Sequence, residues 1–132
     1  MKSFNGHEAN HFSVQEAAAF IGISAHTLRY YERAGLIGSV ARNAAGHRRY
    51  AKIDLERLQF LLCLRAAGMP IRGLREFADL TRQGKSSVDA RWRLLEMHKH
   101  EVQTRIQELQ HSLEVIEGKQ QRYREGLTDK RE

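Results

Sequence analysis

The sequence contains one proline, one cysteine and one tryptophan, and aromatic residues make up 8% of its 132 residues. The single cysteine, Cys63, excludes a disulfide within the chain and fits a reducing cytoplasm. No apolar run reaches the roughly 18–20 residues that a membrane-spanning helix needs, and residues 1–11 lack the apolar stretch of a secretory signal. We therefore expect a cytoplasmic, helical protein without a membrane partner, with room for one modest domain and an appendage.

Acidic residues are missing from one stretch of the chain. Residues 39–52 hold Arg42, Arg48, Arg49 and Lys52 but no aspartate or glutamate. Residues 1–84 as a whole carry 12 Lys or Arg against 7 Asp or Glu, whereas residues 85–132 carry 10 against 9. A basic segment in a chain of pI about 9.8 favours a polyanionic partner such as nucleic acid, although a solvated surface has the same composition.

Local signals predict two short helices followed by a turn-rich segment. A capping box begins at Ser13, and Gly22 ends the apolar run that follows it. Ser24 caps a second helix, which Gly35 ends. This spacing is typical of a helix-turn-helix. In residues 36–50 small and basic residues replace the helical pattern around a central turn, and we interpret this segment as a wing.

Two further helices are predicted before residue 84. The first covers residues 52–67, and one face of it is formed by Leu55, Leu58, Leu61, Leu62 and Arg65. Cys63 lies off this face beside Phe60, Leu64 and Ala67, so we expect it to be sandwiched between two apolar layers. Pro70 opens the second helix, which runs from residue 71 to about residue 82.

The last part of the chain has the clearest periodicity. Apolar residues recur in steps of four and three from Val88 to Tyr123, interrupted only by Lys99 and Gln120. This heptad seam lies on a helix about 50 Å long, and a helix folded back on its own domain would bury only one end of it. We therefore expect a homodimer. The predicted interface residues are Val88, Trp92, Leu95, Val102, Ile106, Leu109, Leu113, Ile116 and Tyr123.

The predicted fold is therefore mainly α. It comprises a disordered tail over residues 1–11, a winged helix-turn-helix DNA-binding domain with two further helices over residues 12–84, a dimerisation helix over residues 86–123 and a short polar tail over residues 124–132. The sequence has no nucleophile–base pair, glycine-rich phosphate loop or cluster of metal ligands, so we expect no enzyme. A coiled-coil scaffold protein would explain the heptads but not the basic pattern that precedes them.

Three motifs at fixed spacing resemble the signature of the MerR family of transcription regulators. They are Thr27-Leu28-Arg29-Tyr30-Tyr31-Glu32, then Gly35-Leu36, then Arg42 with Gly46-x-Arg48-x-Tyr50. The similarity continues through Leu55-x-x-Leu58 and Gly68-Met69-Pro70-Ile71 into the long final helix. The resemblance implies a winged helix-turn-helix, two further helices and an antiparallel coiled coil that joins two protomers.

The candidate DNA-binding residues come from the start of the first helix, the recognition helix, the wing and one later helix. A recognition helix places its N-terminal side chains in the major groove, where Arg29 could bind guanine or a phosphate. Tyr30 and Tyr31 could bind phosphates or belong to the core. In the wing, we expect Arg42 and Arg48 to contact backbone phosphates, supported by Tyr50; the alternative for Tyr50 is packing at the base of the wing. Arg72 resembles a phosphate clamp of the family, aided by its helix N-terminus. The predicted set is Ser13, Ser24, His26, Thr27, Arg29, Tyr30, Tyr31, Arg42, Arg48, Tyr50 and Arg72.

The resemblance also implies partners and a mechanism. Family members bind double-stranded promoter DNA beside RNA polymerase, and they activate by bending and untwisting the spacer between the two polymerase-recognition hexamers. Repression from the same site is equally compatible with the sequence. A protein of this kind works in the cytoplasm on the nucleoid.

The signal that such a regulator would sense is less clearly encoded. The dimerisation helix and the tail contain no cysteine, which argues against thiolate metal sites and iron–sulfur clusters, and His98 and His100 point to different helix faces. We therefore expect no metal and no cofactor. Cys63, before Leu64-Arg65, resembles the cysteine of the aldehyde- and electrophile-responsive NmlR/AdhR-like branch, although Leu62 stands where that branch commonly has lysine. The alternatives are an inert buried thiol, and a regulator that binds a small ligand or acts constitutively.

Overall fold

The computed structural model describes residues 11–38 and 40–126. It divides into two compact units, Met1–Leu94 and Leu95–Glu132, with the boundary inside the last helix. The predicted disordered tail lies outside the described residues except for His11, which is in a strand, and residues 127–132 of the predicted polar tail also lie outside them. Within the described part of the chain, no helix is both long and apolar enough to span a membrane.

The helix-turn-helix forms where the capping signals predict it. Helix α1 (Val14–Ile21) begins at Ser13, whose side chain accepts from the Glu16 amide (3.2 Å) while the Ser13 amide donates to the Glu16 carboxylate (2.9 Å). Gly22 ends α1 in the left-handed conformation, with φ 87°. Helix α2 (Ala25–Arg33) begins at the Ser24 cap, and Gly35 (φ 86°) turns the chain away after it. Both predicted helices are confirmed.

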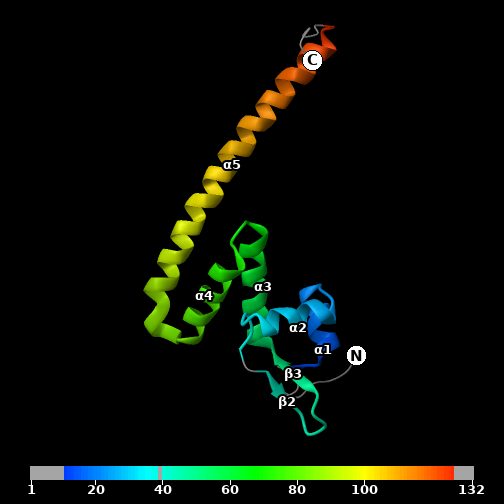
Figure 1. Ribbon diagram of the computed structural model, residues 1–132, viewed down its shortest axis with the longest axis vertical. Coiled ribbons are helices and arrows are strands. Elements are labelled where there is room, and N and C mark those ends of the chain that lie inside the picture. The colour runs from blue at the N-terminus through cyan, green and yellow to red at the C-terminus, as the bar shows by residue number, and fades with distance from the viewer. Residues whose placement is uncertain (1–10, 39, 127–132) are drawn as a thin grey trace. The chain divides into compact units, whose positions relative to one another are not determined.

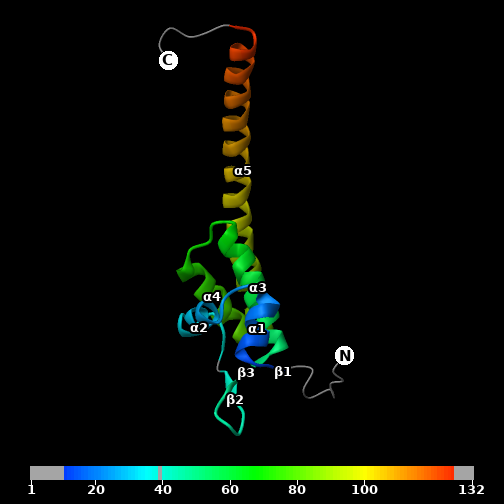
Figure 2. The same ribbon diagram turned by 90° about the vertical axis from the view of Figure 1, so that its right-hand side faces the viewer.

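The wing is also confirmed as a hairpin. Strand β2 (Ala41–Arg42) pairs antiparallel with β3 (Arg48–Ala51). The hairpin projects away from the helices of the first unit (Figure 2). A further strand, β1 (His11–Phe12), lies on the other side of β3 and gives the sheet order β1-β3-β2. The sequence did not indicate β1, because two residues are too short to show an alternating pattern.

Helices α3 (Lys52–Ala66) and α4 (Ile71–Arg82) follow the wing in the first unit (Figure 1). The buried stripe of α3 consists of Leu55, Leu58, Leu61 and Leu64. The face predicted from the sequence was therefore partly wrong, because Leu62 is only half-buried and Arg65 is exposed. The stripe advances in steps of three residues and rotates away from Leu62.

Cys63 does not lie between two apolar layers. Its thiol is free and the residue is exposed in the chain. The expectation of a sandwiched side chain is wrong because the second apolar side of α3, which includes Phe60, is itself exposed. One layer of packing, on the Leu55 side, covers this helix.

The largest fully buried side chains of the first unit come from four of its elements. They are Leu28, Tyr50, Leu55, Leu58 and Leu74. Burial of each aliphatic side chain stabilises the folded state by about 1.5–3 kcal/mol. The entropy lost when the chain is ordered offsets part of this gain. This core joins the recognition helix, the wing strand and helices α3 and α4 in one packing unit.

A short 3₁₀ helix that the sequence did not indicate, η2 (Gly84–Ser87), connects α4 to α5 (Val88–Arg124). The Ser87 hydroxyl lies within hydrogen-bond distance of the Leu80 and Gly84 carbonyls, and Arg91 donates to the Ser87 Oγ (3.0 Å). Helix α5 contains 37 residues without interruption, which corresponds to about 55 Å. The mainly α fold with a long final helix is confirmed (Figure 1).

Candidate nucleic-acid interface

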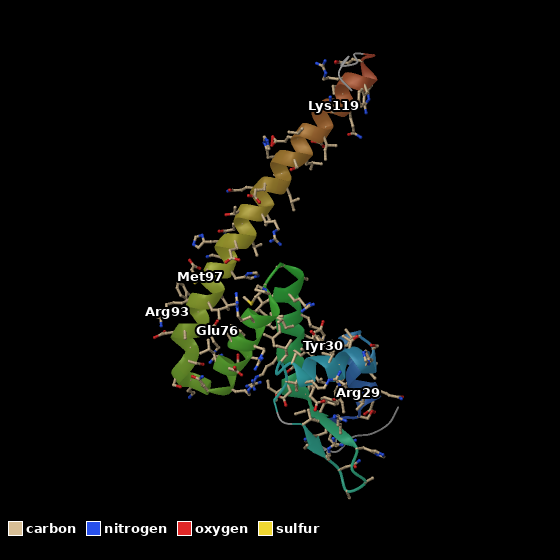
Figure 3. All side chains as sticks on the ribbon, in the orientation of Figure 1. Arg29, Tyr30, Glu76, Arg93, Met97 and Lys119 are labelled. Carbon is tan, nitrogen blue, oxygen red and sulfur yellow. The ribbon has the colours of Figure 1, made fainter. Side chains whose placement is uncertain are left out.

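The recognition helix α2 separates its core side from its solvent side clearly. Leu28 is fully buried, whereas His26 and Tyr30 are exposed and Arg29 is half-buried. Figure 3 shows the side chains of Arg29 and Tyr30 on α2. Ser24 and Thr27 are partly engaged within the helix start, since the Ser24 hydroxyl donates to Thr27 Oγ1 (2.9 Å) and accepts from the Thr27 amide (3.0 Å). Ser24 therefore caps the helix, with Thr27 as its partner, in addition to any contact that either makes with DNA.

The two tyrosines of α2 differ in their surroundings. The rings of Tyr30 and Tyr31 lie 5.5 Å apart, and the Arg65 guanidinium lies 5.9 Å from the centre of the Tyr31 ring. Tyr31 is half-buried beside this cation from α3, while 46% of Tyr30 is exposed. Tyr30 is therefore the more exposed of the two tyrosines.

The tip of the wing is held by its own side chains. The Asn43 Oδ1 accepts from the amides of Ala45 and His47, both at 3.0 Å, and Arg42 Nη1 donates to the Gly46 carbonyl (2.7 Å). Gly46 has φ 85°, a conformation that favours glycine at this turn. Arg42 and His47 are exposed, so a loop of defined shape presents these basic side chains.

A single carboxylate joins the recognition helix to the wing. Glu32, in the last turns of α2, accepts from Arg48 Nε at 3.0 and 3.3 Å and from the Tyr50 hydroxyl at 2.9 Å. Tyr50 is only 1% exposed, and burial together with its bond to Glu32 raises the pKa of Tyr50 from 10.0 to about 12. We call this set of bonds the Glu32 junction. Its partners Arg48 and Tyr50 follow Glu32 by 16 and 18 residues in the chain.

The junction changes how two predicted DNA contacts are interpreted. The Tyr50 hydroxyl is buried on Glu32, which agrees with the alternative that this residue packs at the base of the wing. Arg48 is 30% exposed but its Nε is paired with Glu32. Glu32 itself was not singled out as a functional residue; the signal that could have pointed to it is an acid shortly before a basic segment that contains no acid.

The start of α1 and the wing share one shallow hollow of about 380 Å³. Its lining comprises Ser13, Val14, Gln15, Arg42, Gly46, His47 and Arg48. The structure thus brings together three of the predicted DNA-binding residues, Ser13, Arg42 and Arg48. Arg72 is placed elsewhere, since it is exposed on the first turn of α4 and lines a separate hollow with Arg75. Pro70 begins α4 without a side-chain cap, so its own side chain satisfies none of the first-turn amides.

The described residues contain no group of three or more His, Cys, Asp or Glu side chains that could hold a metal ion. His98 is buried and His100 is exposed, which confirms that these histidines point to different sides of α5. His100 instead lies 3.7 Å from the Glu96 carboxylate.

A capped helix pair, a recognition helix with one exposed side and a structured wing that presents basic side chains define this chain as a winged helix-turn-helix DNA-binding protein. The model of the MerR HTH family regulatory proteins matches residues 12–80, and that of the MerR DNA-binding region matches residues 55–118. The chain belongs to the MerR family and is a DNA-binding transcription regulator, not an enzyme.

Individual relatives agree with this assignment. An uncharacterised helix-turn-helix transcriptional regulator of Haemophilus influenzae is 37% identical over 108 residues, which cover 82% of this chain and 80% of the relative. The transcriptional regulator AdhR of Bacillus subtilis is 40% identical over 83 residues, or 63% of this chain and 59% of AdhR.

Two solved structures resemble the whole fold. The crystal structure of HiNmlR, a MerR family regulator lacking the sensor domain and bound to promoter DNA, is 36% identical, with a TM-score of 0.76 over 87% of this chain and 91% of that one. A MerR family transcriptional regulator from Listeria monocytogenes is also 36% identical, with a TM-score of 0.79 over 85% of each chain. The similarity to NmlR and AdhR is consistent with the branch suggested by the sequence.

The raised pKa of Tyr50 predicts a loss of stability in alkali. The folded chain holds the Tyr50 proton more tightly than the unfolded chain does. The protonated Tyr50 therefore adds to the free energy of unfolding below pH 10, and this stabilisation is lost as the pH rises through 12. Between these limits the free energy of unfolding of the wild type should fall by about 2 kcal/mol more than that of Tyr50→Phe. Denaturant unfolding at both pH values measures the difference. Tyr30→Phe, which removes an exposed hydroxyl, is the control; a Tyr50→Phe variant that follows the wild type would contradict the prediction.

Proposed function

We propose that two copies of this chain bind promoter DNA, with α2 in the major groove and the wing on the phosphate backbone. The observation that carries this proposal is the Glu32 junction, which ties the recognition helix to a wing on which Arg42 is exposed. Phosphates attract such exposed cations, while the side chains of α2 can reach base edges. The promoter complex of HiNmlR, a relative of the same fold, supports this mode of binding.

Arg42→Ala tests the role of the wing. We expect weaker binding to operator and non-operator DNA alike, and a decrease of about one in the slope of log K against log salt, because a phosphate contact carries no sequence information. Fluorescence anisotropy at several salt concentrations measures both quantities. The control is Arg93→Ala, which removes an arginine of α5 outside the recognition helix and the wing (Figure 3). Equal losses in the two variants would mean that general charge, and not the wing, determines the affinity.

We also propose that α5 forms the dimer. Its seam residues are unusually exposed for large apolar side chains: Trp92 is 62% exposed, Ile106 59% and Leu109 64%. The same holds for Val88, Leu113, Ile116 and Tyr123, whereas Leu95 and Val102 are half-buried. A second copy of the helix would cover this stripe over its full length, in the antiparallel coiled coil that the family resemblance implies.

Leu109→Glu should disrupt this dimer. A carboxylate placed in the seam would lose hydration without gaining a partner, so the variant should be monomeric at concentrations where the wild type is dimeric. Sedimentation equilibrium gives the molar mass of each protein. Gln107→Glu adds the same charge two residues away, off the seam, and should leave the dimer intact. A dimeric Leu109→Glu variant would show that α5 does not form the interface.

A dimer of this kind would act by deforming DNA. The two DNA-binding domains of such a dimer, separated by a long helix, can bind backbone phosphates on both sides of a central DNA segment. Neither domain contacts the bases of that segment. Bending and untwisting that segment would then change how RNA polymerase meets its two recognition hexamers. The same geometry permits activation or repression, depending on the spacer.

We further propose that Cys63 senses aldehydes or other thiol-reactive compounds. Two observations support this role: the thiol is free and exposed, and AdhR and NmlR are among the relatives. The sulfur would add to the aldehyde carbonyl carbon, and a proton would pass to the carbonyl oxygen, giving a hemithioacetal without any oxidant. Leu62 provides no cation to favour the thiolate, which supports the alternative of a regulator without thiol chemistry.

Cys63→Ser separates these alternatives. Transcription from the bound promoter, measured with purified RNA polymerase, should respond to formaldehyde with the wild type and lose that response with Cys63→Ser, because a hydroxyl is a much poorer nucleophile than a thiol. Binding of the variant to DNA without aldehyde should equal that of the wild type. If the response to formaldehyde survives the substitution, the thiol hypothesis is wrong.

A further inference from the structure

The first unit contains a cavity of about 380 Å³ that neither DNA binding nor Cys63 uses. It opens between the segment after α2, helices α3 and α4, and the first turn of α5. Its lining comprises Leu36, Ile37, Gly38, Asp54, Glu56, Arg57, Phe60, Leu61, Phe77, Ala78, Thr81, Arg82 and Arg91. This size and this mixture of apolar and charged side chains are typical of sites for small molecules.

The apolar part of the cavity includes an aromatic pair. The rings of Phe60 on α3 and Phe77 on α4 lie 5.5 Å apart at an angle of 51°. Phe77 is buried, but 43% of Phe60 is exposed, beside the buried side chains of Leu36 and Leu61. An aromatic side chain left open within a cavity would gain free energy if a flat apolar ligand displaced the water over it.

The charged part of the cavity contains a cation without a counter-charge. Arg91 donates from Nε to the Ser87 hydroxyl (3.0 Å) and from Nη2 to the Gly84 carbonyl (2.9 Å), and both acceptors are neutral. No carboxylate of residues 11–38 or 40–126 forms an ion pair with it. Arg57 is only loosely paired, with 4.0 Å between its Nη1 and the Asp54 carboxylate. A ligand carboxylate could accept hydrogen bonds from such guanidinium groups.

Other charges in the lining limit what the ligand can be. Arg82 already binds the Asp79 carboxylate and the Gly35 carbonyl, so it adds little free positive charge. Asp54 and Glu56 line the same cavity and would repel a ligand with several negative charges. The lining therefore suits one negative charge attached to an apolar body, and it disfavours nucleotides and other polyphosphates.

We propose that this cavity binds a small monocarboxylate with an aryl or short alkyl body. The carboxylate lies toward Arg91 and Arg57, and the apolar body packs on the Phe60–Phe77 pair. Such a ligand touches α3, α4 and the segment that links the recognition helix to the wing. The proposal is independent of the reactivity of Cys63 and of the DNA sequence bound.

Calorimetric titration of the full chain with phenylacetate tests the proposal. We expect saturable binding of phenylacetate, and at least about tenfold weaker binding of the neutral phenylacetamide, which is 1.4 kcal/mol or more. Arg91→Gln and Phe60→Ala should each weaken phenylacetate binding several-fold. Their matched controls are Arg93→Gln on α5 and Ile53→Ala on α3, which change exposed residues outside the cavity lining and should bind as the wild type does.

Arg91 also braces the α4–α5 connection, so Arg57→Gln provides a second test of the charge without touching that connection. Unchanged DNA affinity of each variant without ligand shows that its fold is intact. The proposal is overturned by any of three results: no saturable binding of phenylacetate, equal binding of acid and amide, or wild-type affinity in both arginine variants. If a second copy of the chain occupied the cavity, phenylacetate would not bind saturably, which is the first of these results.

Discussion

The position of the wing relative to the recognition helix depends on the carboxylate of Glu32. It accepts hydrogen bonds from Arg48 Nε and from the Tyr50 hydroxyl, and both donors lie on β3. A half-buried carboxylate is costly unless donors replace its lost water, and here a charged and a neutral donor do so together. The wing is a hairpin whose strand β3 also pairs with the two-residue strand β1, and so small a sheet has little stability of its own. The orientation of the wing must therefore come from its contacts with the helices. Among these, the contact of Glu32 with Arg48 and Tyr50 is charged and directional.

Local signals were enough to predict most of the fold. Ser13 and Ser24 satisfy amides at the start of their own helices, and Gly22 adopts a left-handed conformation within a few residues of the helix that it ends. Such features involve neighbours in the sequence, so they can be read from it. The Glu32 junction spans 16 to 18 residues and follows no periodicity. This is why the sequence suggested phosphate contacts for Arg48 and Tyr50, although the Arg48 Nε and the Tyr50 hydroxyl are engaged by Glu32.

Exposure along a helix was harder to predict than the helix itself. Helix α3 has apolar residues on two sides, and a helical wheel does not tell which side the rest of the chain covers. The structure covers the side of Leu55 and Leu58 and leaves Phe60 and Cys63 open. The heptads of α5 present the same question on a larger scale, because the partner that would cover them is another chain. Periodicity thus identifies an apolar face, but only the packed structure shows which element or chain covers that face.

Helix α3 links the candidate sensing features to the DNA-binding surface. Strand β3 ends at Ala51, which is also the N-cap of α3, so the backbone passes from the wing into the helix without a loop. Cys63 lies toward the far end of α3, and Phe60 and Arg57 on the same helix line the cavity. A packed helix moves as a rigid body more readily than it bends. A shift of α3 caused by an adduct or a ligand would therefore displace Arg48 and Tyr50 relative to Glu32. The bonds of these two residues to Glu32 set the position of the wing.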